Sequence, residues 1–138
     1  MTRGDFQKLT NERIADAEAL LQAGRFGGAY YFSGLAVECA LKACIAGKTN
    51  ASDFPDLKRA QNSHQHDLER LIETAELKST LDQQMAANQK FTVNWNTVKQ
   101  WRIETRYEPN VGQSKAQELF SCTRENNDGV LSWLRTVW

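Results

Sequence analysis

The chain has 138 residues, of which 41% are hydrophobic and 25% are charged. This length and composition are typical of one globular domain and exclude a disordered or fibrous chain. Lysine plus arginine and aspartate plus glutamate both number 17, so no overall positive field draws in nucleic acid. Any contact with nucleic acid must therefore depend on a local patch.

The first predicted element is an amphipathic helix from about residue 5 to residue 23, which ends at Gly24. Its apolar side chains recur with helical spacing, at Leu9, Ile14, Ala17, Leu20 and Leu21. The polar sequence at the start of the chain lacks the apolar core of a secretion signal. We therefore expect a cytoplasmic protein.

The second predicted helix, residues 27–46, is apolar except for one acid and one base, Glu38 and Lys42. A spacing of four residues places both side chains on one helix face, acid before base, which favours an ion pair. The apolar run is shorter than the ~20 residues that cross a bilayer. We expect the core helix of a bundle, with no membrane span.

Three cysteines, Cys39, Cys44 and Cys122, are odd in number and scattered along the chain. The first two lie inside the apolar helix and lack the spacing of metal ligands. All three are predicted to be reduced thiols in the core. The sequence thus predicts no metal site and no cofactor.

Residues 47–63 have the composition of a surface connection, with one short helical turn expected after Pro55. A third helix is predicted from near His66. Its buried stripe consists of Leu68, Leu71, Ile72 and Ala75. A short helix that carries Leu81 and Met85 is expected next.

A further short helix is predicted to be capped by Asn94. It carries Trp95, Val98 and Trp101. The chain has four tryptophans, and all of them are expected in the core or in a dimer interface: Trp95, Trp101, Trp133 and Trp138. Residues 102–112 then break the helical pattern, because Pro109 restricts the residue before it.

The last predicted helix is long and begins at Ser114, with Gln117 completing a capping box. Its stripe runs through Ala116, Leu119, Phe120, Thr123, Asn127, Val130, Leu131 and Leu134. Strand-like alternation is absent from the sequence. We therefore predict one all-α domain over residues 1–138, a bundle of about four main helices with short extra helices before the last one.

Three sequence segments occur in a recognisable order before this last helix. They are AYYFSGLAVECALKA, which contains Glu38 and Lys42; HDLERL, which begins at His66; and RYEP, which begins at Arg106. In this order and spacing they resemble the HEPN family, small helical domains of higher eukaryotes and prokaryotes, over residues 27–135. The resemblance implies a four-to-five-helix up-and-down bundle that is usually a homodimer.

The resemblance also implies a range of functions. The family includes ribonuclease toxins, partners of minimal nucleotidyltransferases, and nucleotide-binding modules without catalysis. Its prokaryotic members often belong to toxin–antitoxin or phage-defence gene pairs. We therefore expect a prokaryotic module that binds a nucleotide, RNA or a partner protein, with a minimal nucleotidyltransferase as the expected partner.

Active ribonucleases of the family carry an arginine and a histidine about four to six residues apart, after the RY-type turn. The histidine transfers a proton for attack by the 2′-hydroxyl, and the arginine stabilises charge on the phosphate. Arg106 stands at the arginine position, but Val111, Gly112 and Gln113 stand at the required distance from it. The sequence therefore favours a module without catalysis.

One pair does have the required spacing, because Arg59 precedes both His64 and His66 by a permitted distance. It lies in the connection before the third helix, away from the position at which the family's ribonucleases carry the pair. The alternative function is a metal-independent endoribonuclease with a non-standard general base, such as Glu108 or His66 brought near Arg106 by folding or dimerisation.

Arg102 and Arg106 are four residues apart and can present two guanidinium groups to a phosphate. Together with Tyr107 and Glu108 they form the candidate site for an anionic ligand. Two structural alternatives remain open: Glu104 and Glu108 neutralise the arginines, or Arg106 pairs with Glu38 as a buried strut.

Tyr107 can stack on a base, but we expect its ring to close the core with its hydroxyl bonded to a polar neighbour. His66 is expected to bond a carbonyl or a carboxylate, since no second metal ligand lies at helical spacing from it. Glu38, Lys42 and His66 are thus the predicted buried polar network.

Overall fold

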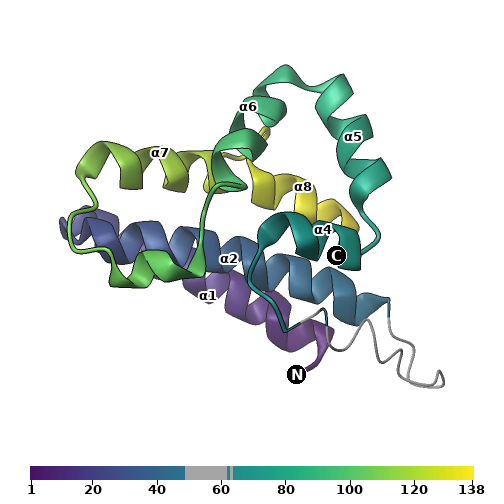
Figure 1. Ribbon diagram of the computed structural model, residues 1–138, viewed down its shortest axis with the longest axis horizontal. Coiled ribbons are helices and arrows are strands. Elements are labelled where there is room, and N and C mark those ends of the chain that lie inside the picture. Colours follow the sequence, from purple (N-terminus) through teal and green to yellow (C-terminus); the bar gives the residue numbers. More distant parts are fainter. Residues whose placement is uncertain (49–61, 63) are drawn as a thin grey trace.

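The computed structural model describes residues 1–48, 62 and 64–138 (Figure 1). These residues form seven α-helices and one 3-10 helix, with no strand among them. The elements are α1 (Arg3–Gln22), α2 (Phe26–Gly47), α4 (Leu68–Thr74), α5 (Lys78–Ala87), α6 (Gln89–Val98), η1 (Ile103–Tyr107), α7 (Gln113–Arg124) and α8 (Val130–Val137). The predicted all-α bundle is confirmed.

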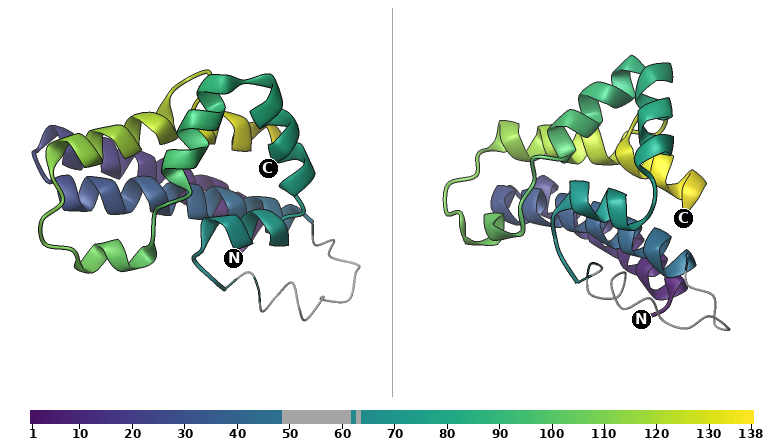
Figure 2. Two further views of the ribbon diagram at one scale, coloured as in Figure 1. Left: turned by 45° about the horizontal axis from the view of Figure 1, so that its top comes forward. Right: turned by 45° about the vertical axis from the view of Figure 1, so that its right-hand side comes forward.

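Helix α2 lies at the centre of the bundle. It forms an antiparallel hairpin with α1 and contacts α7, α8, α4 and η1 on its other faces (Figures 1 and 2). Helices α5 and α6 pack against each other, and α6 also contacts α7 and α8. The central position of α2 explains why its sequence is apolar on nearly every side.

The α1–α2 hairpin has the boundaries that the sequence predicts to within two residues. Thr2 caps α1: its hydroxyl accepts a hydrogen bond from the Asp5 N–H, and its own N–H donates to the Asp5 carboxylate. Gly24 adopts a positive φ of 75° after the helix, which lets the chain reverse within a few residues.

The core of the bundle is built on α2. Ala36, Val37, Ala40 and Leu41 are all completely buried. Among the described helices, α2 is the one long and apolar enough to cross a membrane, and 72% of its most apolar window is buried against the rest of the structure. The thiols of Cys39, Cys44 and Cys122 are free and buried, as predicted.

Helix α4 begins after His66 and buries the predicted stripe, and α5 carries Leu81 and Met85 as expected. The prediction that Asn94 caps the next helix is wrong. Asn88 is the N-cap of α6, where its side chain accepts from the Phe91 N–H at 3.0 Å. Asn94 lies within α6 and donates to the Asp128 carbonyl at 2.9 Å instead.

The predicted long last helix is two helices, α7 and α8. The capping box is also wrong, because α7 begins at Gln113 after Gly112 and has no side-chain cap. Gly129 ends the turn between the two helices, where a Cβ would lie 2.3 Å from the Glu125 carbonyl oxygen. This close approach requires glycine, and it interrupts the helix although the apolar stripe continues in phase.

The tryptophan prediction is confirmed for the core. Trp95, Trp101 and Trp133 are buried, and the partly buried Trp138 packs against the core. The segment that breaks the helical pattern contains η1, a 3-10 helix that the sequence does not predict. The expected helical turn after Pro55 and the residue Arg59 lie outside the described residues.

Candidate functional site

The buried carboxylate of Glu38 is the centre of the site. Its side chain is only 4% exposed, and its Oε1 atom accepts a hydrogen bond from Lys42 Nζ at 2.9 Å. The same oxygen lies 2.8 Å from Nδ1 of His66, whose side chain is 47% exposed. The structure thus brings together the three residues of the predicted polar network and lets one of them reach solvent.

Asp67 positions the segment that carries His66. One oxygen of its carboxylate caps α4 by accepting from the Arg70 N–H at 3.1 Å. The other oxygen lies 3.2 Å from Nη1 of Arg102. Sequence reasoning missed this residue, although an aspartate directly before an apolar helical stripe is an N-cap signal.

Trp101 holds the segment that carries Arg102 against α2. Its completely buried indole lies directly over Gly34, where a Cβ would be 2.2 Å from ring atoms. The ring centroid of Tyr31 lies 6.1 Å from that of Trp101. Tyr31, Gly34, Glu38 and Lys42 share one face of α2, because their spacings of three and four residues follow the helical repeat.

Arg106 and Tyr107 form the outer end of the site. The Arg106 guanidinium carbon lies 4.8 Å from the centroid of the Tyr107 ring, and Tyr107 is 73% exposed. The electrostatic influence of Tyr107, with hydrogen bonds to the side chains of Tyr107 and Tyr31, raises the pKa of Arg106 above its usual value. The guanidinium therefore stays charged on an aromatic surface that faces solvent.

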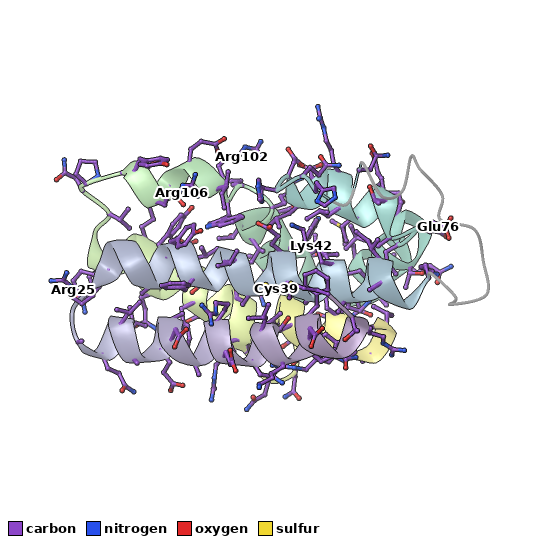
Figure 3. The ribbon with its side chains drawn as sticks, turned by 90° about the horizontal axis from the view of Figure 1, so that it is seen from below. Arg25, Cys39, Lys42, Glu76, Arg102 and Arg106 are labelled. Carbon is purple, nitrogen blue, oxygen red and sulfur yellow. The ribbon has the colours of Figure 1, made fainter. Side chains whose placement is uncertain are left out.

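We call this set of residues the α2 strip. Its members are Tyr31, Glu38, Lys42, His66, Asp67, Arg102, Arg106 and Tyr107. Figure 3 shows Arg102, Arg106 and Lys42 on the side of α2 opposite α1, whereas Cys39 lies between the two helices. In the strip three cations, Lys42, Arg102 and Arg106, face two carboxylates, Glu38 and Asp67. Its formal charge is thus positive before His66 is counted.

Two of the structural alternatives for Arg106 and Tyr107 are wrong. Arg106 does not pair with Glu38, because η1 carries it to Tyr31, which precedes Glu38 by seven residues or about 10 Å along the axis of α2. Tyr107 does not close the core, because η1 leaves its ring on the surface.

Neutralisation of the arginines by neighbouring glutamates is not observed either. Glu108 pairs with Lys115 at 3.6 Å, and Arg102 pairs with Asp67. Among the described residues Arg106 forms no ion pair with a carboxylate. Its charge is therefore available to an anionic ligand.

Comparison with known families decides what kind of domain carries this strip. The chain matches the model of the HEPN domain over residues 8–133. The chain belongs to the HEPN domain family. No curated protein and no solved structure matches it. Membership of the HEPN family implies a function related to nucleotides or RNA.

In this HEPN domain the three positions where a catalytic histidine would follow Arg106, residues 111–113, lie just before and at the start of α7 and contain none. The two histidines of the chain, His64 and His66, both precede α4. No group of three or more potential metal ligands occurs in residues 1–48, 62 and 64–138. The strip therefore offers cations, an aromatic ring and one imidazole.

A separate cavity of about 150 Å³ lies between α4, α5 and α6 of the HEPN domain. Its walls are formed by Glu69, Ile72, Glu73, Lys78, Leu81, Asp82, Met85, Trp95 and Lys99. Lys78 and Asp82 form an ion pair at 2.7 Å at its rim. None of these residues belongs to the α2 strip.

Proposed function

We propose that this HEPN domain binds RNA or a nucleotide along the α2 strip and does not cleave it. The observation that carries the proposal is the exposed Arg106–Tyr107 stack, which η1 holds on the same side of α2 as Arg102 (Figure 3). An aromatic ring and two guanidinium groups on one surface match the two parts of a nucleotide, its base and its phosphate.

The physical basis is stacking combined with charge. An exposed aromatic ring that stacks on an unpaired base contributes about 1–3 kcal/mol to binding. Arg106 already lies over one face of Tyr107, so the guanidinium and the ring form a single platform. A guanidinium also keeps donors for a phosphate while it stacks.

Sequence and geometry both argue against cleavage at this platform. The arginine on the platform has no histidine after it at the distance that the family's ribonucleases use. The imidazole of the strip is bonded to Glu38, about 10 Å along α2 from the turn that contacts Arg106. The platform therefore lacks the imidazole that the family's ribonucleases use for proton transfer, and the neighbouring carboxylate of Glu108 pairs with Lys115 instead.

The biological setting of the proposal rests on what is common in the family. We propose a cytoplasmic homodimer that works in a toxin–antitoxin or defence-type pair with a minimal nucleotidyltransferase. Light scattering on the purified protein measures the dimer. Co-purification with the product of a neighbouring nucleotidyltransferase gene tests the partner, and a monomer that binds no such product contradicts this setting.

Fluorescence anisotropy with labelled single-stranded RNA tests the binding site. We expect Arg106→Ala and Tyr107→Ala each to weaken binding by about 5- to 150-fold, which corresponds to the loss of one stacked base. Arg106→Lys, which keeps the charge but loses the planar group, should weaken binding as well. Arg124→Ala is the matched control, since Arg124 is an exposed arginine in the last turn of α7 and lies outside the α2 strip.

Unchanged affinity in Arg106→Ala and Tyr107→Ala would contradict the proposed site. Circular dichroism of these variants checks the fold, which should be intact because both side chains are exposed.

A second candidate function is the metal-independent endoribonuclease with His66 as general base. It is favoured by the 2.8 Å contact between His66 and Glu38, since a carboxylate commonly orients the imidazole of a general base. Gel analysis of end-labelled RNA after incubation with the protein separates the two functions. Cleavage that disappears in both His66→Ala and Arg106→Ala would show that the enzyme is the correct assignment.

A further inference from the structure

We infer that His66 recognises ribose: its Nε2 atom accepts a hydrogen bond from a 2′-hydroxyl of the bound strand, so that the α2 strip selects RNA over DNA. This inference rests on the proposed function, because it concerns a strand already bound at the strip.

Glu38 determines which nitrogen of His66 carries the hydrogen. The Glu38 oxygen that lies 2.8 Å from Nδ1 also accepts from Lys42, as an ionised carboxylate does. A carboxylate only accepts, so the hydrogen of the shared bond is on Nδ1. In the neutral ring the second nitrogen, Nε2, then has a lone pair and accepts a hydrogen bond.

Two ion pairs lie beside His66 among the described residues. Lys42 provides the ammonium that balances Glu38, at 2.9 Å from the same oxygen. Asp67, the residue after His66, pairs with Arg102 at 3.2 Å. Glu38 and Asp67 thus each have a cation already, so neither depends on His66 for a counter-charge.

Nε2 is placed where a ligand can reach it. The His66 side chain is about half exposed, whereas Glu38 behind it is buried. Among the described residues no group forms a hydrogen bond with Nε2. The buried partner therefore holds Nδ1, and about half of the side chain stays open to solvent.

A lone-pair acceptor distinguishes the two kinds of nucleic acid. Phosphate oxygens at neutral pH only accept hydrogen bonds, so they gain nothing from a neutral Nε2 atom. A 2′-hydroxyl donates, and it is present in every ribonucleotide but absent from DNA. The Arg102 guanidinium, held next to His66 through Asp67, contacts the phosphate of the same nucleotide in this arrangement.

The test compares three single strands of identical base sequence by fluorescence anisotropy at about pH 8, where an unperturbed imidazole is neutral. One strand is RNA, one is DNA with uracil bases, and one is 2′-fluoro RNA, which has no hydrogen to donate at the 2′ position. We expect wild-type protein to bind RNA about two- to tenfold more tightly than the other two strands, the value of one hydrogen bond.

His66→Ala should weaken binding of RNA to the level of DNA, so that the ratio of the two affinities falls to about one. His64→Ala is the matched control and should retain the preference, because His64 is exposed and no contact joins it to Glu38 in the described residues. Tyr107→Ala should weaken binding of all three strands by the same factor, since a base stacks whatever its sugar is.

Equal affinity of wild-type protein for RNA and 2′-fluoro RNA would overturn the inference, and this measurement does not depend on a variant. A preference for RNA that persists in His66→Ala would overturn it as well. Strand binding without discrimination leaves the proposed function intact, whereas no binding of any strand overturns both.

Discussion

Helix α2 meets α1 with one face and η1 with another, and the two faces differ in packing and in charge. Toward α1 the helix is closely packed: a Cβ at Gly28 would lie 3.0 Å from the Leu20 side chain, and Arg13 covers the ring of Phe32 at 5.7 Å. Toward η1 the same helix carries Glu38 and Lys42. The first face meets a cation only from α1, at Arg13, whereas the second carries its own buried charge and leads it outward.

The difference shows how a core helix supports a binding surface. On the η1 face Gly34 admits Trp101, and Trp101 brings a polar segment against an otherwise apolar helix. Glu38 is buried beside it, but its partner His66 is half exposed. The side chains that meet the ligand are therefore held by groups that the ligand never contacts.

The largest expected effect comes from removing the carboxylate on the η1 face. Glu38→Ala should lower the free energy of unfolding by about 3 kcal/mol, because Lys42 then loses its partner in a largely buried position. Urea unfolding measures the change. Asp82→Ala is the matched control: its pair with Lys78 has the same spacing but is exposed to solvent, so the expected loss is much smaller. Similar losses in both variants would show that burial does not make the Glu38–Lys42 pair more important for stability than the exposed pair.

The next largest effect on stability is expected at the contact between Gly34 and Trp101. Gly34→Ala should cost about 1–3 kcal/mol, because the new methyl group overlaps the Trp101 ring and forces the segment before η1 outward. Tryptophan fluorescence should shift to longer wavelength as the indole becomes wetter. Gly27→Ala, where no atom lies within 4 Å of the added Cβ, should leave stability and emission nearly unchanged. A Gly34→Ala protein as stable as wild type would mean that the close contact is unimportant.

The third prediction tests how completely the packed parts of α2 are sealed from water. Burial raises the pKa of Cys39 and of Cys44 from 9.0 to about 11. Both thiols ionise earlier in the unfolded chain than in the folded one, so their contribution to stability is present below pH 9 and is lost as the pH rises toward 11. At pH 10 the expected loss is about 1 kcal/mol for each thiol.

Urea unfolding at pH 8 and pH 10 measures this loss, and the Cys39→Ala/Cys44→Ala double variant supplies the comparison. The difference between the two pH values should be smaller in the double variant than in wild type. The same pH dependence in both proteins would show that water reaches these thiols in the folded state.

On the η1 face of α2 the sequence predicts the buried ion pair well, but it does not predict which side chains of the neighbouring segment face solvent. Two charges in an apolar run four residues apart must pair, and burial by neighbouring helices follows from the apolar run itself. Arg106 and Tyr107 lie in a segment without helical periodicity, so no pattern tells which side chains face the core. Their exposure depends on η1, a short element that tertiary packing positions through Trp101 on Gly34 and through Ile103 and Thr105 against the core.

The boundaries of the C-terminal helices show a second limit of periodicity. The apolar stripe passes from Thr123 to Val130 in phase, since seven residues are close to two helical turns. The break is encoded instead by the turn residues that precede Gly129. Asn88 and Asn94 illustrate the same problem for caps, because both precede apolar residues and only tertiary contact assigns Asn94 to Asp128.

The two oxygens of the Asp67 carboxylate bind different partners, so Arg102 can move at a small cost in free energy. Oδ1 caps α4, whereas Oδ2 holds Arg102 at a largely exposed position. A phosphate that attracts Arg102 therefore disrupts one solvent-screened ion pair, worth at most about 1 kcal/mol, and leaves the helix start untouched. Arg102 can follow an incoming strand while the backbone beneath it keeps its conformation.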